Sequence, residues 1–398
     1  MEIVVAAGAR TPFGDFLGAL ADVAPTDLGA AAVGGALQRA AVAPSEVDHV
    51  VFGNVLQVTT DAIYFARHVA LKSGCTMATP AVTVNRLCGS GLEAIVQGAR
   101  LIQTGEAGIV VAGGAENMSQ TPHAVYGARK GLRLGQGKLE DTLWASLTDT
   151  YCGLPMAKTA EKLAAEYGIS REDQDAFALR SELAAKEASE SGRLAAEIVP
   201  VTVPGGRSGR VVDRDEAPTF DTTLEKLAGL RAAFGKDGTV TAGNASGIAD
   251  GAAAVVLMSR DTAEKRGLAA LGRLVAHGVA GVDPSIMGIG PAPASRQALD
   301  RAGWQLADVD LVEINEAFAA QYLAVERELG LDRERTNVNG GAISLGHPLG
   351  ASGARLAVTL LHEMNRRRAS GAHSPVKGLA ALCIGGGQGI AALFATLS

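Results

Sequence analysis

The chain has 398 residues, of which 47% are hydrophobic and 20% charged, and its formal net charge is −6. This composition is typical of a folded protein with a large core and excludes a disordered chain, and the length favours roughly two or three domains. The acidic balance, without a basic stripe, argues against a protein that binds nucleic acid.

The first residues predict a β-strand over residues 3–7, followed by a turn at Pro12 and Gly14. The same stretch lacks the basic region and the long apolar run of a signal peptide. No run of about 18 apolar residues predicts a membrane span. We therefore expect a globular protein of the cytoplasm that binds neither nucleic acid nor membrane.

Short apolar runs alternate with helical patterns, which predicts an α/β fold in layers. The predicted buried strands cover residues 50–52, 109–112, 253–258, 311–314 and 379–384. Directly after Cys88, the apolar residues Leu92, Ile95, Ala99 and Ile102 fall on one face, which predicts a helix.

A second helix is predicted to begin at Ser170, since Ser170 and Asp173 have the spacing of a capping box. It lies within residues 119–244, which carry more charge, more turn residues and fewer strand-like runs than the two ends of the chain. We interpret this segment as a loop domain inserted over a core, although surface loops have a similar composition.

The two ends of the chain share a pattern. Each has a strand that ends in Val-Asn, a turn of small residues, an amphipathic helix, and a strand that enters a glycine-rich turn. The second copy matches the first only with an insertion. Two α/β halves related by a pseudo-twofold axis would bring Cys88, His347 and Cys383 together at strand ends, where ligands bind in such sheets.

The 4 Cys are few and scattered for a chain of this length, which argues against a disulfide framework, and they form no CxxC pair, which argues against a metal site with thiolate ligands. Cys88 lies in NRLCGSG, immediately before the predicted helix, and a helix N-terminus favours a reactive thiolate. Cys383 precedes the glycines of CIGGGQG, whose backbone N–H groups can converge on an oxygen. A buried structural cysteine is the alternative at both positions.

Two further polar positions can carry chemistry. His347 lies in the loop GGAISLGHPLGASG and can take and return a proton near neutral pH, or merely cap a turn. Asn315 and Glu316 follow the strand predicted over residues 311–314. Asn315 can orient a water or cap a helix, and Glu316 can be an ordinary residue of a helix start.

Together, the segments ARTPFG, NRLCGSG, GTVTAGNASGIADGAA, NEAFA, GGAISLGHPLGASG and CIGGGQG resemble the thiolase family across the whole chain, and most closely its acetyl-CoA acetyltransferase branch. The resemblance implies a fold of duplicated α/β halves, a layered αβαβα core, with an inserted loop domain. The implied boundaries are residues 1–118 plus 245–270 for the N-terminal half, 119–244 for the loop domain, and 271–398 for the C-terminal half.

The resemblance implies that Cys88 carries the acyl group, that His347 activates Cys88, and that Cys383 moves the proton on the substrate α-carbon. One oxyanion hole would consist of His347 and a water held by Asn315, and the other of the backbone N–H groups of Cys88 and Gly385. The implied reaction is a reversible ping-pong condensation of two acetyl-CoA to acetoacetyl-CoA and CoA. These thioesters are substrates, and no tightly bound cofactor or metal is expected.

The family positions that contact coenzyme A or its acyl group correspond to Met156, Phe234, Ala242, Ser246, Met287, Ala317 and Phe318. The chain departs from the family at two places. Pro155 stands where the branch often has His or Asn, which removes a polar contact in the pantetheine tunnel. Segment 217–226 shows no obvious basic residue for the coenzyme phosphates, which leaves Arg210, Arg214 and Lys158 as candidates.

Residues 119–139 resemble the loop through which tetrameric thiolases associate, so we expect a homotetramer built from two dimers. In this loop Arg129, Lys130 and Arg133 either face the coenzyme of a neighbouring subunit or belong to a solvated basic loop.

Three other functions compete with this interpretation. A degradative 3-ketoacyl-CoA thiolase of broad chain length would share the chemistry and differ only in the acyl pocket. A ketoacyl synthase is disfavoured because those enzymes usually lack a cysteine at the position of Cys383. A non-catalytic protein that binds acyl-CoA or lipid would have little reason to keep Cys88, Asn315, His347 and Cys383. The glycine-rich strings do not form the GxGxxG motif of a NAD-binding unit.

Overall fold

A computed structural model describes residues 1–204, 209–219, 221–235, 237–372 and 375–397. Its centre is a ten-stranded mixed sheet with the order β14-β15-β16-β13-β1-β12-β5-β3-β4, and β2 pairs with β12. The strands are β1 (Ile3–Arg10), β2 (Gly14–Asp15), β3 (His49–Gly53), β4 (Ala81–Val84), β5 (Ile109–Asn117), β12 (Ala249–Ser259), β13 (Gly272–Gly281), β14 (Leu311–Ile314), β15 (Lys377–Ile384) and β16 (Gln388–Ala395). Each predicted strand therefore lies within an observed one, and the first extends to Arg10.

The sheet consists of two similar halves. In the N-terminal half β3 pairs in parallel with β4 and β5, and β12 runs antiparallel to β5 and β1. In the C-terminal half β14 and β15 are parallel, and β16 runs antiparallel to β15 and β13. The halves join where β1 pairs with β13. At the edge of the C-terminal half, Thr336 forms a parallel bridge with Val312 of β14. This bridge occupies the position that β4 has beside β3 in the N-terminal half. The predicted duplication is confirmed.

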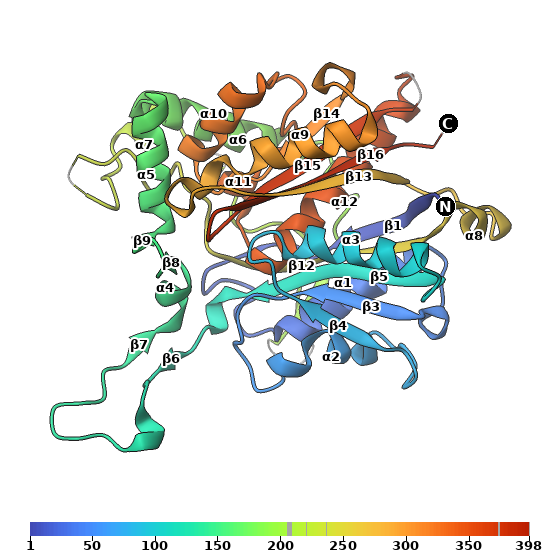
Figure 1. Ribbon diagram of the computed structural model, residues 1–398, viewed down its shortest axis with the longest axis horizontal. Helices are drawn as coiled ribbons and strands as arrows, with labels where there is room; N and C mark the ends of the chain where they lie inside the picture. Colours follow the sequence, from blue (N-terminus) through green and yellow to red (C-terminus); the bar gives the residue numbers. More distant parts are fainter. Residues whose placement is uncertain (205–208, 220, 236, 373–374, 398) are drawn as a thin grey trace.

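Helices form three layers around the two halves of the sheet, and Figure 1 shows α3 (Ser90–Gln103) and α12 (Leu349–Ala369) between them. The outer face of the N-terminal half carries α1 (Pro25–Arg39) and α2 (Phe65–Lys72), and that of the C-terminal half carries α9 (Pro291–Ala302) and α10 (Ala319–Leu329). The two short helices α8 (Arg260–Lys265) and α11 (Ala342–Leu345) connect elements of this core. These layers match the αβαβα core that the family resemblance implies.

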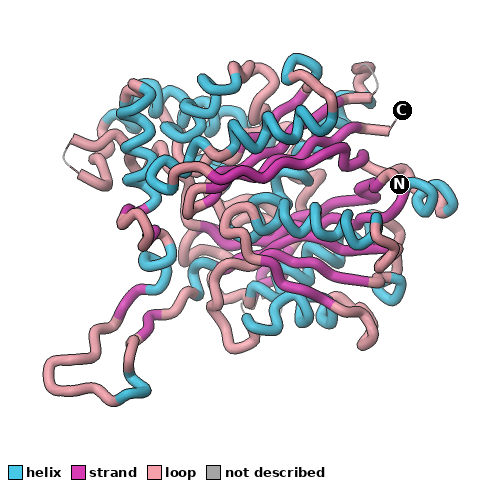
Figure 2. The backbone as a smooth tube through the Cα atoms, in the orientation of Figure 1, coloured by secondary structure: helices cyan, strands magenta, loops and turns pink. Residues whose placement is uncertain are grey.

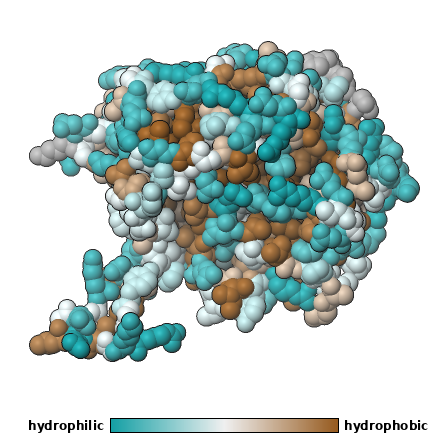
Figure 3. Space-filling view, in the orientation of Figure 1, coloured by the Kyte–Doolittle hydropathy of each residue, from teal (hydrophilic) through white to brown (hydrophobic). Residues whose placement is uncertain are grey.

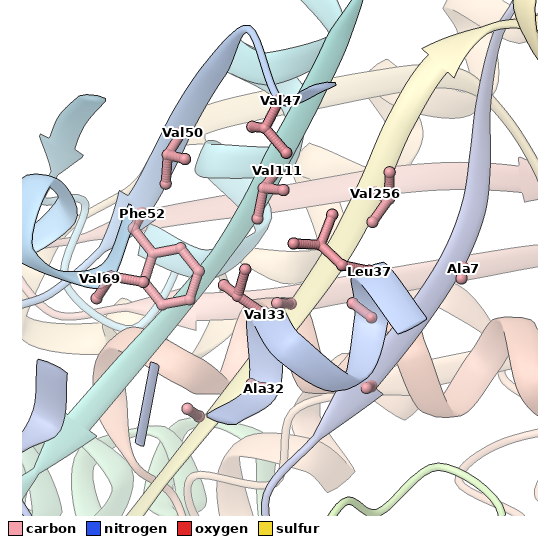
Figure 4. Packing of buried hydrophobic residues seen from close by; sticks show 14 of the residues in the cluster. Ala7, Ala32, Val33, Leu37, Val47, Val50, Phe52, Val69, Val111 and Val256 are labelled. Carbon is pink, nitrogen blue, oxygen red and sulfur yellow. The ribbon is translucent and has the colours of Figure 1, made fainter. Parts of the chain in front are cut away.

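Apolar side chains fill the space between the layers. In Figure 4, Val33 and Leu37 of α1 point toward Phe52 of β3, Val111 of β5 and Val256 of β12. A second buried cluster lies around α3 and α12, and a third lies between the C-terminal half of the sheet and its outer helices. Burial of this apolar surface is the main favourable term that holds the layers together.

Two glycines set how closely the central helices approach. A Cβ on Gly91 of α3 would lie 2.6 Å from the backbone N of Ala354, and one on Gly353 of α12 would lie 2.4 Å from the backbone N of Leu92. Backbone therefore packs directly on backbone where α3 crosses α12. This crossing places the start of α3, beside Cys88, near the start of α12, beside His347.

Residues 119–244 lie outside the layered core. They form the pairs β6 (His123–Ala124) with β7 (Glu140–Asp141), β8 (Thr148–Asp149) with β9 (Leu154–Pro155), and β10 (Val201–Val203) with β11 (Arg210–Val212), together with the helices α4 (Thr142–Ser146), α5 (Met156–Tyr167), α6 (Arg171–Glu190) and α7 (Leu224–Ala228). Figure 2 shows β6 and β7 at the base of an arm that projects from the molecule.

The predicted capping box is confirmed, since Ser170 accepts a hydrogen bond from the backbone N–H of Asp173 and caps α6. The exact domain boundaries stay a prediction. Within the described residues, the helices are too short or too polar to cross a membrane.

Candidate active site

Cys88 lies at the tip of the tight turn that connects β4 to α3. Leu87, directly before it, has a left-handed backbone with φ of 47°, which is strained for a residue with a side chain. The turn is held by the backbone N–H of Leu87, which donates to Asn85 Oδ1 at 2.9 Å, and by Ser90 Oγ, which donates to the Leu87 carbonyl at 2.6 Å. A Cβ on Gly89 would lie 2.7 Å from Ile384 Cδ1 and 2.9 Å from Ile390 Cγ2, so a larger residue after Cys88 would have to displace these side chains. These contacts hold the turn that carries Cys88.

The surroundings of Cys88 are apolar. Cys88 packs against a cluster of Leu56, Met118, Leu143 and Leu349. Burial raises the pKa of the Cys88 thiol to about 11, and a hydrogen bond from the backbone N–H of Gly385 opposes this rise. The sequence had predicted a more accessible thiolate at the helix N-terminus. Loss of solvation opposes that effect, and the raised pKa favours the neutral thiol in the resting site.

His347 lies between Gly346 and Pro348, directly before α12, and its backbone N–H donates to the Gly247 carbonyl at 2.9 Å. Its ring contacts two side chains: Nδ1 lies 2.6 Å from Ser352 Oγ, and Nε2 lies 3.3 Å from Asn315 Nδ2. Burial lowers the pKa of His347 to about 3, and the nearby Arg355 guanidinium adds to the effect. The imidazole is therefore neutral and able to accept a proton.

Cys383 is the second-last residue of β15, and it packs against Met287 and Ala317. Burial raises the pKa of the Cys383 thiol far above its usual range, and a charge on Cys88 would raise it further. After Ile384 the chain turns through Gly386 and Gly387, which both have positive φ. Gly385 is buried at the start of this turn, and a Cβ there would lie 3.2 Å from Met156 Sδ.

One cavity of about 230 Å³ brings three of the predicted catalytic side chains together, since Cys88, His347 and Cys383 all line it. Apolar side chains make up most of its wall. Of the predicted coenzyme positions, Met156, Phe234, Ser246, Met287, Ala317 and Phe318 line the cavity. Ala242 is exposed and lies outside this lining, where Ala245 takes part instead.

Asn315 and Glu316 directly follow β14, and the Asn315 side chain contacts the His347 ring. Asn315 is fully buried at the end of β14, and its Oδ1 has no hydrogen-bond partner among the described residues. Because α10 begins only at Ala319, Asn315 is not a helix cap. The fully buried Glu316 carboxylate accepts hydrogen bonds from Ser181 Oγ at 2.6 Å and from Asn337 Nδ2 at 2.8 Å. Glu316 therefore ties α6 to the strand that carries Asn315.

Sequence reasoning missed several cavity residues. They are Met118, Trp144, Leu147, Ile248 and Leu349. Trp144 of α4 stacks on Phe234 with ring centroids 6.2 Å apart and an interplanar angle of 3°. Leu349 stands two residues after His347, so proximity to the motif was a signal for it. Trp144, by contrast, belongs to none of the motifs, so nothing in the sequence indicated that it lines the cavity.

The basic residues are spread over the surface. Lys158 lies on α5, and its Nζ would be 3.2 Å from a Cβ on Gly235, next to Phe234 of the cavity wall. Arg210 and Arg214 are exposed at β11 and just after it, outside the cavity lining. Within segment 217–226, Phe220 lies outside the described residues, and the basic Lys226, which the sequence reasoning passed over, pairs with Asp221.

The other candidate groups lie away from the cavity. Arg129, Lys130 and Arg133 are exposed on the arm between β6 and β7. Among the residues that the structure describes, no group of three or more His, Cys, Asp or Glu side chains is arranged to hold a metal ion.

Two family models match the chain: "Thiolase, N-terminal domain" over residues 3–261 and "Thiolase, C-terminal domain" over residues 268–396. The chain is 52% identical over 392 residues to human mitochondrial 3-ketoacyl-CoA thiolase, covering 98% of this chain and 97% of the relative. It is also 52% identical over 397 residues to an acetyl-CoA acetyltransferase of Pseudomonas aeruginosa, with 98% of each covered. The crystal structure of the human mitochondrial enzyme in complex with CoA superimposes with a TM-score of 0.95 at 51% identity, covering 100% of this chain and 98% of that one.

Proposed function

The chain belongs to the thiolase family of acyltransferases, and on that premise we propose that it is an acetyl-CoA C-acetyltransferase. It condenses two acetyl-CoA to acetoacetyl-CoA and CoA, and it cleaves acetoacetyl-CoA with CoA in reverse. The observation that carries this proposal is the convergence of Cys88, His347 and Cys383 on one apolar cavity. A nucleophile, a base and a second thiol in one pocket suit a reaction with two half-steps.

In the first half-step Cys88 attacks the thioester carbonyl of acetyl-CoA, and the Cys88 proton moves to His347 Nε2. CoA leaves as a thiol after it takes that proton, and acetyl-Cys88 remains. A thiol with a pKa of about 11 beside an imidazole with a pKa of about 3 stays neutral at rest. The proton therefore moves as the sulfur–carbon bond forms, and a free thiolate does not accumulate beforehand.

In the second half-step the neutral Cys383 thiol passes its proton to His347 Nε2, and the resulting Cys383 thiolate takes a proton from the methyl group of a second acetyl-CoA. The carbanion attacks the carbonyl of acetyl-Cys88, and the Cys88 thiolate leaves and takes the proton that His347 Nε2 holds. The enolate oxygen is stabilised by His347 and a water held by Asn315. The oxygen on Cys88 is stabilised by the backbone N–H groups of Cys88 and Gly385. The contact between the Gly385 N–H and the Cys88 sulfur supports this assignment.

The pantetheine arm of the coenzyme runs along the apolar wall that Met156, Phe234 and Phe318 form. Ser246 supplies a hydroxyl in this wall, and Met287 borders the acyl group. The human relative binds CoA in its crystal structure, which supports coenzyme A as the ligand here. For the phosphates we favour Lys158, because it stands beside the cavity wall, whereas Arg210 and Arg214 lie outside it.

A second candidate function is thiolysis of longer 3-ketoacyl-CoA. The specific observation in its favour is the apolar wall beside Cys88, where Met118, Leu147 and Ile248 leave no polar group to reject a longer chain. Pro155 adds to this wall where the acetyltransferase branch often has a polar residue. The relatives carry both names, 3-ketoacyl-CoA thiolase and acetyl-CoA acetyltransferase.

One assay separates the candidates. The purified protein is given CoA with either acetoacetyl-CoA or a long-chain 3-ketoacyl-CoA, beside the Cys88→Ala and Cys383→Ser variants. Our proposal expects the larger kcat/KM with acetoacetyl-CoA, no turnover by Cys88→Ala, and residual acyl exchange without condensation in Cys383→Ser. A larger kcat/KM with the long chain favours the degradative thiolase. Absence of turnover with every thioester favours a protein that only binds acyl-CoA.

We also propose that the enzyme is a tetramer made of two dimers. The arm between β6 and β7 exposes Tyr126, Leu132, Leu134 and Leu139, and Figure 3 shows apolar side chains at its end. Strand β4 is the open edge of the sheet, and Val82 on it is exposed. Exposed apolar groups at an arm and at a sheet edge suit association with other copies. Light scattering at micromolar protein tests this state, and a dimer would contradict it.

Location in the cytoplasm is part of the proposal. Fractionation of the source cells with an antibody to the chain checks it, and recovery in an organelle, as the name of the human relative describes, would contradict it.

A further inference from the structure

The protons around His347 can be assigned from the contacts of one neighbour, Ser352. Ser352 is fully buried in the first turn of α12, and its Oγ makes two short contacts. It donates to the carbonyl of Pro348 at 2.8 Å, and it lies 2.6 Å from His347 Nδ1. A hydroxyl has a single proton, and a carbonyl oxygen can only accept. With that proton given to Pro348, Ser352 Oγ must accept a hydrogen bond from the ring.

The opposite nitrogen of the ring gives a second constraint. In the orientation that the structure gives the Asn315 amide, its donor Nδ2 lies 3.3 Å from His347 Nε2, and its Oδ1 has no hydrogen-bond partner among the described residues. A proton on Nε2 would set one donor against another inside a buried site, where an unmet polar contact is costly. Nε2 therefore carries the lone pair, and Nδ1 carries the proton. Both contacts lead to the same tautomer.

We propose that Ser352 is a positioning residue that holds His347 in the Nδ1–H tautomer, with the Nε2 lone pair directed at the reacting groups. This inference rests on the proposed function, in which Nε2 takes the proton of Cys88. A free imidazole exchanges between two tautomers, and only the one with an unprotonated Nε2 can act as this base. Ser352 does not touch the substrate, and it acts through the ring that it holds.

The direct test is the ¹⁵N NMR spectrum of the enzyme labelled at histidine. The signals of His347, identified by their loss in His347→Gln, should show a protonated Nδ1 and an unprotonated Nε2. In Ser352→Ala, where the Asn315 contact alone remains to select a tautomer, the population with a protonated Nδ1 should fall. A wild-type spectrum with the proton on Nε2 would overturn the proposal, whatever the activity of the enzyme.

Kinetics provide the second readout. Ser352→Ala should lower kcat for thiolysis of acetoacetyl-CoA about 100-fold, the scale of lost general base catalysis, and change the KM for CoA much less. Thr359→Val is the matched control, because Thr359 is a buried hydroxyl on the same helix that bonds to Glu197 at 3.1 Å, away from the cavity. This control should keep both kcat and the His347 spectrum.

The two proposals fail in different ways. Wild-type protein that shows the predicted tautomer but turns over no thioester would count against the proposed function alone. Ser352→Ala with an unchanged spectrum and unchanged kcat would count against the role of Ser352 alone. If Ser352→Ala does not fold, the wild-type spectrum still decides the assignment.

Discussion

The backbone N–H of Gly350, at the start of α12, donates a hydrogen bond of 2.9 Å to the buried carboxylate of Glu116, in β5 of the other half. The same carboxylate accepts from the backbone N–H groups of Val55 and Leu56 and from Asn54 Nδ2. Gly350 stands three residues after His347, and Leu56 packs in the cluster against Cys88. The Glu116 carboxylate therefore connects the segment after β3, which packs against Cys88, to α12, the helix that follows His347.

Substitution of Glu116 should weaken this connection. Glu116→Gln turns one acceptor oxygen into an N–H₂ group that faces N–H donors, so we expect a loss of about 3 kcal/mol in the free energy of unfolding. Chemical denaturation followed by circular dichroism measures it. Glu334→Gln, at an exposed glutamate, is the control and should be neutral. Equal stability of Glu116→Gln and the wild type would contradict this account.

The crossing of α3 and α12 should not tolerate a methyl group. Gly91→Ala places a Cβ 2.6 Å from the backbone N of Ala354, so the helices must separate, which we expect to cost about 3 kcal/mol and most of the activity. Gly34→Ala is the matched control, because its Cβ would point into open space on α1. It should stabilise the fold by about 0.5–1 kcal/mol. Thermal unfolding of both variants checks the pair, and Gly91→Ala with wild-type stability would refute the packing argument.

The high pKa of Cys88 predicts slow alkylation at neutral pH. Burial raises this pKa to about 11, so the thiolate fraction, and with it the rate of reaction with iodoacetamide, should rise about tenfold per pH unit from neutral pH toward that value. Mass spectrometry of the Cys88 peptide over a pH series measures the rate, and Cys88→Ala identifies reaction at other cysteines. A rate that levels off near pH 7 would show that the thiolate is stabilised in the resting enzyme.

The stacked pair of Trp144 and Phe234 should contribute to coenzyme binding. Trp144→Ala removes the ring that packs on Phe234 at the cavity wall, which should raise the KM for CoA up to about tenfold and leave kcat nearly unchanged. Steady-state thiolysis with varied CoA measures both constants. Tyr151→Ala, at an exposed aromatic residue outside the cavity lining, should change neither. A fall in kcat without a change in KM would place Trp144 in another role.

Local patterns in the sequence predicted some of the helices and strands, because the residues that cause them lie within a few positions of one another. The apolar face from Leu92 to Ile102 and the capping box at Ser170 are such cases, and both are present. The repeated pattern at the two ends also predicted that the halves would bring Cys88 and His347 to one place. The turn in NRLCGSG places Cys88 just before a helix, and the loop in GGAISLGHPLGASG does the same for His347.

Contacts between residues far apart in the sequence could not be predicted from local sequence patterns. Arg10 of β1 bonds to Glu197 and Asp215, which are 187 and 205 residues away, and these buried pairs fasten the inserted segment to the core. Glu116 and Trp144 likewise gain their roles only from what the fold places beside them. Burial of the Cys88 thiol raises its pKa and opposes the predicted ease of forming the thiolate, and this burial depends on all the elements that meet at the cavity.

Mass spectrometry of the enzyme after incubation with acetyl-CoA tests the central claim most directly. The protein is mixed with acetyl-CoA, quenched in acid and digested, and each cysteine peptide is examined for an acetyl group. The account predicts one acetyl group on the peptide that contains Cys88, removed by later addition of CoA, and none on any cysteine of Cys88→Ala. Acetylation of Cys383 instead, or turnover of acetoacetyl-CoA without any acetylated Cys88, would contradict it.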